Sequence, residues 1–277
     1  MKTSNFIPAI SVFLISWQTL PSSGPDLKKM HLRGQVKSIT STEYGIDEKS
    51  GGALKDDPKR TTTTFFNDRG NIAWQKITQK SLPGVGTPRY MEEAIYYSYN
   101  KEGKISQWRK ENDGHLTDQS DFKYTDNLVE EKSHSRNVVR KYDNQNNNAE
   151  EEVYLNGGVL LEKFIRKYDN RHQMTEEFLY SRKGELVRNT MYRFDESGNL
   201  VEKKLQYYGK PDISETITAK YNSAGDETEG HRQQTGKPAL LNTYEYVYDL
   251  HSNWIKKTTF KNNRQEFVME RRITYFK

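Results

Sequence analysis

The residue types that carry most metal and thiol chemistry are scarce in this chain. It has no cysteine, which excludes disulfides, thiol nucleophiles and cysteine–zinc sites. The histidines are His31, His115, His134, His172, His231 and His251. Zinc ligands occur at short paired spacings, whereas these histidines lie far apart and mostly at predicted turns. Phosphate-binding, dinucleotide-binding and serine-nucleophile motifs are missing as well. We therefore predict no metal, no cofactor and no catalytic residue.

Adjacent glutamates are the remaining candidates for acid–base chemistry. Pairs such as Glu130–Glu131 and Glu176–Glu177 would serve a glycosidase if both carboxyl groups reached one bond. Successive residues of a strand point to opposite faces, so neither pair converges. A carbohydrate-active enzyme would instead need loop carboxylates from Asp56, Asp57 or Asp113. We keep such an enzyme as an alternative hypothesis.

Three tryptophans offer flat rings on which a sugar could stack. Trp254 occupies a repeated apolar position and Trp74 is expected on the face of Ile72, so core packing is the better interpretation for both. Strict alternation places Trp108 on the face opposite to Ile105, which we expect to be wet. Trp108 is therefore the one candidate binding residue.

The N-terminus has the order of regions found in a secretory signal peptide. Residues 1–5 form a short, positively charged stretch. Residues 6–17 are twelve uncharged and mostly apolar residues, and residues 18–24 are mostly small or polar. Twelve residues are too few for a membrane-spanning helix, which needs about 20. We predict a signal peptide over 1–24 and one β domain over 25–277. The protein is then exported, to the periplasm, the outer membrane surface or the medium, with no transmembrane segment once the signal is removed.

A repeat fills the rest of the chain. Its unit is an aromatic residue, then Asp or Asn, a turn with Gly or Asn, and an apolar residue. Five of these Asp/Asn positions are separated by 26, 26, 27 and 27 residues: Asp143, Asp169, Asp195, Asn222 and Asp249. A second turn lies about halfway between them, so each unit is two strands joined by hairpins. The span from Val36 to Phe276 then holds about eighteen strands. Longer loops are expected at 45–59 and 81–88.

The strands have one aromatic and one charged face. Beside the turns, the charged face carries Lys123, Lys141, Lys167, Arg193 and Lys220. Acidic residues follow the same turns, so cross-strand pairing explains this column better than a nucleic-acid stripe does. We predict no nucleic-acid partner. Charge interrupts both faces, which also argues against a transmembrane barrel.

The aromatic face must be buried, so the sequence predicts an all-β antiparallel meander. We expect either a curled single sheet or two packed layers. Val36–Tyr44 and Glu266–Phe276 are the expected edge or capping strands, and Thr61–Phe66 is the most adhesive exposed strand.

The repeated unit resembles the YD repeats of the Rhs family, most clearly in FDESGNL (194–200) and YEYVYDLHSNWIKK (244–257). The resemblance extends from about residue 60 to the C-terminus, with departures at Asn100, Thr125 and Asn222. Large Rhs proteins wrap such repeats into a shell around a toxin. This short chain is more similar to small secreted YD-repeat proteins of the envelope, so the resemblance implies a fold and a compartment.

These observations together predict an exported, non-enzymatic scaffold or binding protein of the cell envelope. Its partner would be a protein or a glycan, recognised over a broad sheet surface. The alternatives are the carbohydrate-active enzyme described above and a component of a Rhs-like toxin or immunity system.

Overall fold

The computed structural model describes residues 26–277 except 48–49, 81–89 and 210–212. The predicted signal peptide and the predicted loop at 81–88 lie outside the described residues. The described part holds one short helix and eighteen strands. Their bounds are α1 Asp26–Lys29, β1 Val36–Ile46, β2 Ala53–Phe66, β3 Ile72–Lys80, β4 Tyr90–Tyr99, β5 Ile105–Asn112, β6 His115–Thr125, β7 Leu128–Ser133, β8 Arg136–Tyr142, β9 Asn148–Leu155, β10 Leu160–Tyr168, β11 Met174–Ser181, β12 Leu186–Phe194, β13 Leu200–Tyr207, β14 Ser214–Tyr221, β15 Glu227–Gln234, β16 Leu240–Tyr248, β17 Trp254–Lys261 and β18 Arg264–Tyr275.

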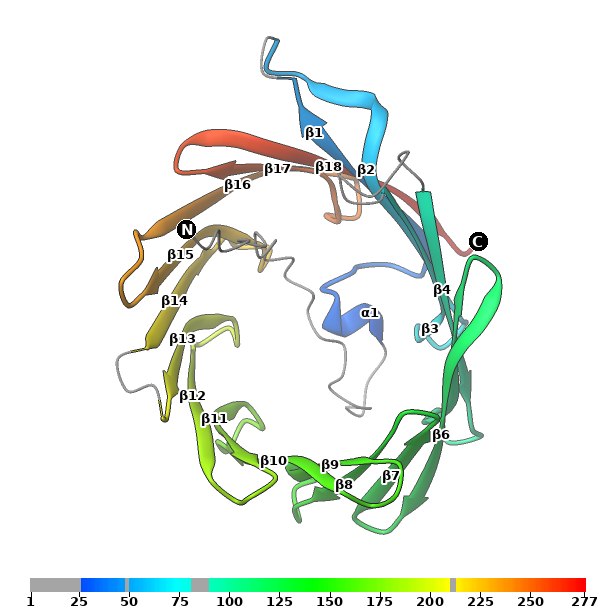
Figure 1. The fold of residues 1–277 in the computed structure, drawn as a ribbon. Coiled ribbons are helices and arrows are strands. Elements are labelled where there is room, and N and C mark those ends of the chain that lie inside the picture. Colours follow the sequence, from blue (N-terminus) through cyan, green and yellow to red (C-terminus); the bar gives the residue numbers. More distant parts are fainter. Residues whose placement is uncertain (1–25, 48–49, 81–89, 210–212) are drawn as a thin grey trace, which may run out of the picture.

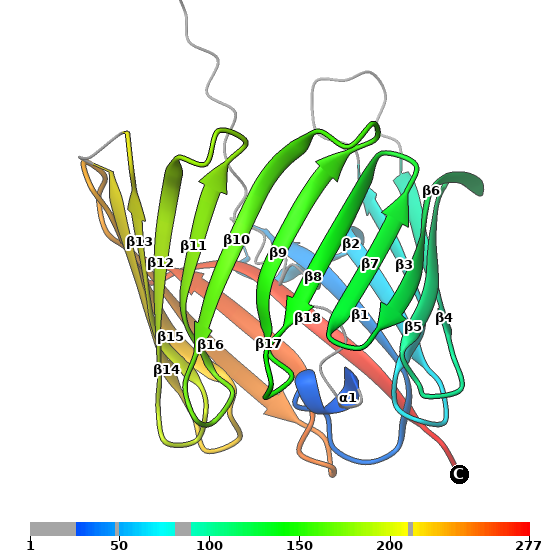
Figure 2. The same ribbon diagram turned by 90° about the horizontal axis from the view of Figure 1, so that it is seen from below.

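The strands close into a barrel. Each pairs antiparallel with the next along the chain, and β18 returns to pair with β1 from Val36↔Tyr275 to Gly45↔Phe267. Figure 1 looks along the axis of this ring, and Figure 2 shows the tilted strands from the side. The predicted antiparallel meander is confirmed, but it is a closed barrel and not a curled open sheet or two layers.

Closure also corrects the predicted edges. Val36–Tyr44 and Glu266–Phe276 are neighbours across the closing seam and are not sheet edges. Thr61–Phe66 lies in β2, between β1 and β3, and has no free edge. Closure is favourable because it pairs the N–H and C=O groups that an edge strand leaves open. The loop expected at 45–59 is mostly strand, since β1 reaches Ile46 and β2 starts at Ala53.

The repeated Asp/Asn positions cap the turns at one end of the barrel. Between β8 and β9, Asp143 Oδ1 accepts the backbone N–H groups of Gln145 (2.9 Å) and Asn147 (2.8 Å). Asn146 has φ of 64°, a left-handed conformation that Asn tolerates well. Asp169 and Asp249 cap their own turns in the same way. Each 26-residue spacing therefore holds two strands and two turns, and one of the two turns is capped by Asp or Asn.

A β-bulge follows most of these capped turns. In β8–β9, Tyr142 pairs with Asn148 and Lys141 with Glu150, which leaves Ala149 without an opposite residue. The extra residue breaks the alternation of faces by one position. The same shift leaves Ser106 unopposed between β4 and β5.

The short helix identifies the inner face of the barrel. Figures 1 and 2 place α1 within the ring. Leu27, Met30 and Leu32 pack against a buried cluster of Val36, Ile39, Phe66 and Ile72, together with Tyr97, Ile273 and Tyr275. Residues paired across neighbouring strands share a face, so the registers extend this assignment from Tyr97 around the ring. The predicted aromatic face is therefore the inner wall.

The segment after α1 is fastened to the closing strands. The backbone N–H of Arg33 donates to Asn253 Oδ1 (2.8 Å), and Asn253 Nδ2 donates to the Arg33 carbonyl (2.8 Å) and to the Tyr275 hydroxyl (2.8 Å). Asn253 is only 2% exposed. These bonds join the capped end of β16–β17 to the chain that enters β1.

Candidate binding surface inside the barrel

The inner wall is the candidate binding surface. A barrel of eighteen strands is too wide for its inner side chains to fill. Inward-facing residues such as Tyr142, Phe164, Tyr168 and Tyr246 accordingly remain partly exposed. The aromatic face is therefore partly open to the interior of the barrel.

Several inner tyrosines are held rigidly by their hydroxyl groups. Tyr168 Oη donates to the Asn148 carbonyl (2.9 Å) and Tyr246 Oη to the Glu227 carbonyl (2.7 Å). Equivalent bonds are made by Tyr99, Tyr124 and Tyr221. Each joins the end of one hairpin strand to the start of a strand in an adjacent hairpin, so the rings have fixed orientations.

Three arginines alternate with three glutamates on the inner wall of β7–β12. At the start of this row, Arg140 Nη2 lies 2.8 Å from Glu131 Oε2, and Arg140 Nε lies 2.9 Å from Glu151 Oε2. The Arg140 side chain is 5% exposed, so these ion pairs are largely removed from water. Trp108 Nε1 also donates to Glu131 Oε1 (3.0 Å).

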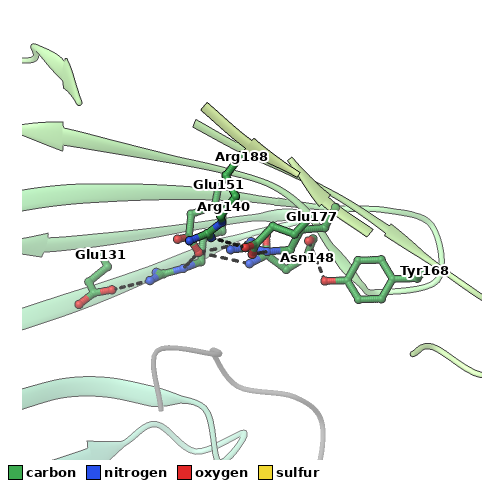
Figure 3. Close-up of polar contacts among 8 residues, drawn as sticks. Glu131, Arg140, Asn148, Glu151, Tyr168, Glu177 and Arg188 are labelled. Carbon is green, nitrogen blue, oxygen red and sulfur yellow. Dashed lines mark hydrogen bonds and ion pairs between the residues drawn. The ribbon is translucent and has the colours of Figure 1, made fainter. Parts of the chain in front are cut away.

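The row continues through β10–β12, as Figure 3 shows. Arg166 Nε lies 3.0 Å from Glu177 Oε2, and Arg188 Nη2 lies 3.1 Å from Glu177 Oε1. Arg166 Nη1 is 3.6 Å from Glu151. Burial opposes the charge of Arg166, yet Glu151 and Glu177 raise its pKa above the ordinary value. We call Glu131, Arg140, Glu151, Arg166, Glu177 and Arg188 the paired row.

A second charged group lies on the inner wall of β16–β18 and has a different composition. The Arg271 guanidinium carbon is 3.2 Å from the ring centroid of Trp254, and Lys257 Nζ is 4.0 Å from Tyr244 and 5.5 Å from Tyr246. Neither cation forms an ion pair with another described residue. Arg271 Nε is buried without a hydrogen-bond partner in the described structure. We call these five residues the cationic–aromatic cluster.

The positive charge of this cluster is incompletely compensated. Burial lowers the pKa of Arg271 to about 9, and Asp226 only partly opposes the effect. Burial also lowers the pKa of Lys257 against the attraction of Glu227, and the neighbouring Arg271 adds to the lowering. Glu227 has its own pKa raised by burial. The cluster therefore lacks the close carboxylates that hold the arginines of the paired row.

The structure corrects the position of Trp108. It pairs with Tyr97 and faces the inside of the barrel, not the wet outer face. The reason is the bulge at Ser106, which places Ile105 and Trp108 on one face although they are three residues apart. Its role in binding stays a prediction.

The other two tryptophans also have defined positions. Trp74 was expected beside Ile72, but it faces outward and stacks on Phe65 at a centroid distance of 4.2 Å. Trp254 faces inward and contacts Tyr246 at 6.0 Å.

The outer wall carries the predicted pairs of opposite charge. Salt bridges join Lys141 to Glu150, Lys167 to Glu176, Arg193 to Glu202 and Lys220 to Glu229. Four of the five residues of the basic column are thus paired, whereas Lys123 lies opposite Glu130 in the register without an ion pair among the described residues. The outer wall also bonds Lys76 to Glu92, far around the ring from these pairs.

The glutamate pairs point to opposite walls, as predicted. Glu130 and Glu176 face outward, whereas Glu131 and Glu177 belong to the paired row. The sequence analysis assigns the acidic residues after the turns to pairs with the basic column and therefore does not predict the paired row.

A usable signal for the paired row was present in the sequence. In Arg140-x-Tyr142 and Arg166-x-Tyr168, the arginine is two residues from a tyrosine of the aromatic face. Residues two apart in a strand share a face, so both arginines had to point inward.

The loop carboxylates of the enzyme hypothesis have separate structural contacts. Asp57 accepts from Lys80 Nζ (2.7 Å) and Tyr90 Oη (3.5 Å), and Asp113 Oδ1 accepts from the Glu92 backbone N–H (3.0 Å). The described residues contain no group of three or more His, Asp or Glu suited to a metal ion. Among the described helices, none has the length and apolar character needed to cross a membrane.

Comparisons with known proteins support the fold. No family model and no curated protein matches the chain. A porin-like protein from Bacteroides uniformis matches 86% of this chain and 98% of its own, with a TM-score of 0.52 and 9% identity. A porin-like protein from Bacteroides vulgatus matches 71% of this chain and 96% of its own (TM-score 0.43, 12% identity), and the TcdB2-TccC3-Cdc42 structure matches 83% and 20% (TM-score 0.20, 11% identity).

The first of these similarities defines the class of fold. The chain is an antiparallel barrel similar to a porin-like protein. The other two are too weak to carry a structural argument. The resemblance to the Rhs family stays a prediction.

Proposed function

We propose that this chain is an exported, non-enzymatic binding protein of the cell envelope, and that its inner wall recognises a glycan. The observation that supports this most directly is the set of partly exposed aromatic rings on the inside of a wide barrel. Aromatic faces pack against the apolar faces of sugar rings, and nearby polar groups bond their hydroxyls.

The rigidity of the inner tyrosines favours this function. Tyr168 and Tyr246 are fixed by hydrogen bonds to backbone carbonyls, so their rings lose little conformational freedom when a ligand stacks on them. Fixed rings of this kind give a broad binding surface without a deep pocket.

The outer wall favours a barrel surrounded by water. A lipid-facing barrel needs an outward apolar band about 25 Å tall. Here outward positions in the middle of strands also carry ion pairs, such as Lys163–Glu152 and Lys204–Glu202. Lysine facing lipid at mid-depth would cost about 2–4 kcal/mol for each residue. The ligand surface is then the inner wall, since outer charges are occupied with one another.

A porin-like pore in a membrane is the second candidate, favoured by the shared fold. Flotation with lipid vesicles separates the two. The binding protein stays in the aqueous fraction without detergent, whereas a pore floats with the vesicles.

The proposed glycan binding is tested with residues 26–277 on a glycan array, followed by titration of the best ligand. Trp108→Ala removes an inner ring and Trp74→Ala removes an outer ring. We expect Trp108→Ala to weaken binding about tenfold, which corresponds to the loss of one aromatic contact of about 1.4 kcal/mol, and Trp74→Ala to leave it unchanged.

Trp108→Phe controls for the lost contact with Glu131, because it keeps a ring but not the N–H donor. Binding that survives Trp108→Ala but is lost in Trp74→Ala would place the ligand on the outer wall and contradict the proposal. An array without any bound glycan would reject glycan recognition altogether.

A further inference from the structure

We infer that Lys257 and Arg271 bind an anionic group of the ligand, so that the glycan recognised by the inner wall is an acidic one. This inference rests on the proposed function and names the chemical class of its ligand. The anionic group is a carboxylate, and the neighbouring aromatic rings contact the sugar that carries it.

The cations of the inner wall differ in whether they have counter-ions. Arg140 and Arg166 each contact two glutamates, at distances from 2.8 to 3.6 Å. Lys257 and Arg271 contact aromatic rings, and neither forms an ion pair with another described residue. A partly buried cation without a counter-ion is costly, and a bound anion removes that cost.

Lys257 and Arg271 lie close together on the same face of adjacent strands. Lys257 pairs with Met269 across β17–β18, and Arg271 lies two residues further along the same face of β18. The two positive groups are thus neighbours on adjacent strands. Arg271 Nε has no hydrogen-bond partner among the described residues, so this donor is available for a contact with a carboxylate.

Aromatic rings contact both cations. Trp254 lies against the Arg271 guanidinium, and Tyr244 and Tyr246 flank the Lys257 ammonium. These rings hold both cations in place before a ligand arrives. They also supply apolar faces for a sugar ring next to its acidic group.

The nearest acidic residues limit the charge of the ligand. Asp226 and Glu227 both attract Lys257, and Glu227 is itself shifted toward its neutral form by burial. The cluster therefore has a limited excess of positive charge, which suits a ligand that presents one carboxylate to it.

The experiment follows tryptophan fluorescence of residues 26–277 during titration with an oligogalacturonate and with a neutral galactose oligosaccharide of equal length. Lys257→Met removes an inner charge, and Lys256→Met removes the adjacent outer charge as a matched control. We expect the acidic ligand to bind at least about tenfold tighter, as a charged hydrogen bond predicts. Lys257→Met abolishes the preference, Lys257→Arg restores it, and Lys256→Met leaves it intact.

The outcomes separate this inference from the function on which it rests. Equal binding of acidic and neutral ligands, unchanged by Lys257→Met, overturns the inference and leaves glycan binding in place. Binding of neither ligand overturns both. Inorganic sulfate serves as the third probe: competition with the oligogalacturonate supports the shared anion contact, whereas sulfate that binds alone as tightly as the sugar acid overturns the assignment to a glycan.

Discussion

The paired row and the cationic–aromatic cluster occupy the same wall of one barrel but have different neighbours. In the paired row, the registers place Arg140 opposite Glu151 and Arg166 opposite Glu177. In the cluster, Lys257 lies between Tyr246 and Met269. Hairpins of the same repeat therefore carry paired arginines and glutamates on the inner wall of β7–β12 but, among the described residues, cations without ion pairs on the inner wall of β16–β18.

The difference separates structural charge from charge available to a ligand. The arginines of the paired row have glutamate counter-ions that compensate their charge, although Arg140 Nη1 and Arg188 Nε lack hydrogen-bond partners among the described residues. Cations that face only rings keep the capacity to pair with a ligand. We therefore assign the paired row to the stability of the barrel and the cluster to recognition.

The largest expected effect is a loss of folding stability at high pH. It comes from the largely buried tyrosines that both regions contain. Burial raises the pKa of Tyr142 beside the paired row and of Tyr244 in the cluster to about 12, from 10.0. Tyr97, Tyr192 and Tyr221 are shifted to the same value. Between pH 10 and 12 the unfolded chain loses protons that the folded chain keeps, so stability falls as pH rises.

Each tyrosine contributes about 1 kcal/mol to this loss, after the full shift is halved for the partial exposure of the rings. The five tyrosines together contribute a fall of about 5 kcal/mol across the window, and Arg271, whose pKa burial lowers to about 9, opposes part of it. Urea unfolding at pH 9 and above, with the tyrosinate absorbance followed in parallel, measures it. Stability that stays level until all tyrosines have ionised would show that the rings are freely solvated.

The next largest loss of stability is expected for a variant that disrupts only the paired row. Arg140→Met leaves Glu131 and Glu151 without their shared cation in a nearly dry site. Removing one partner of a buried ion pair costs about 3–5 kcal/mol, and we expect a loss of about 3 kcal/mol in urea unfolding. A loss below about 0.5 kcal/mol, the level of an exposed pair, would mean that the row is solvated.

The smallest loss of stability is expected for Lys141, which follows Arg140 in the sequence and faces the outer wall. Lys141→Met removes an ion pair with Glu150 in which the lysine is 48% exposed. Exposed pairs are worth about 0.5 kcal/mol, so unfolding should change by no more than that. A loss equal to that of Arg140→Met would remove the distinction between the two walls.

Much of the fold was readable from the sequence because the repeat is local. The capped turns of Asp143, Asp169 and Asp249 set the strand count. Closure was not predictable, since it depends on a pairing between β1 and β18 that are more than 200 residues apart in the chain.

The candidate site was harder to predict because of bulges. A single unopposed residue, Ser106, reversed the expected face of Trp108. The registers at Lys257 and Arg271 lie beyond similar bulges, so strict alternation cannot show which cations meet a carboxylate and which meet a ring.

The measurement that tests the central claim most directly compares Arg166→Met with Lys257→Met by urea unfolding in the absence of ligand. We predict that Arg166→Met, which leaves Glu151 with Arg140 alone and Glu177 with Arg188 alone, costs about 3 kcal/mol, at the low end for a broken buried ion pair. We also predict that Lys257→Met changes stability by less than about 1 kcal/mol, because the lost cation–ring contact is offset by relief of an uncompensated charge. Equal losses for the two variants would contradict the division of the inner wall into a structural and a recognising arc.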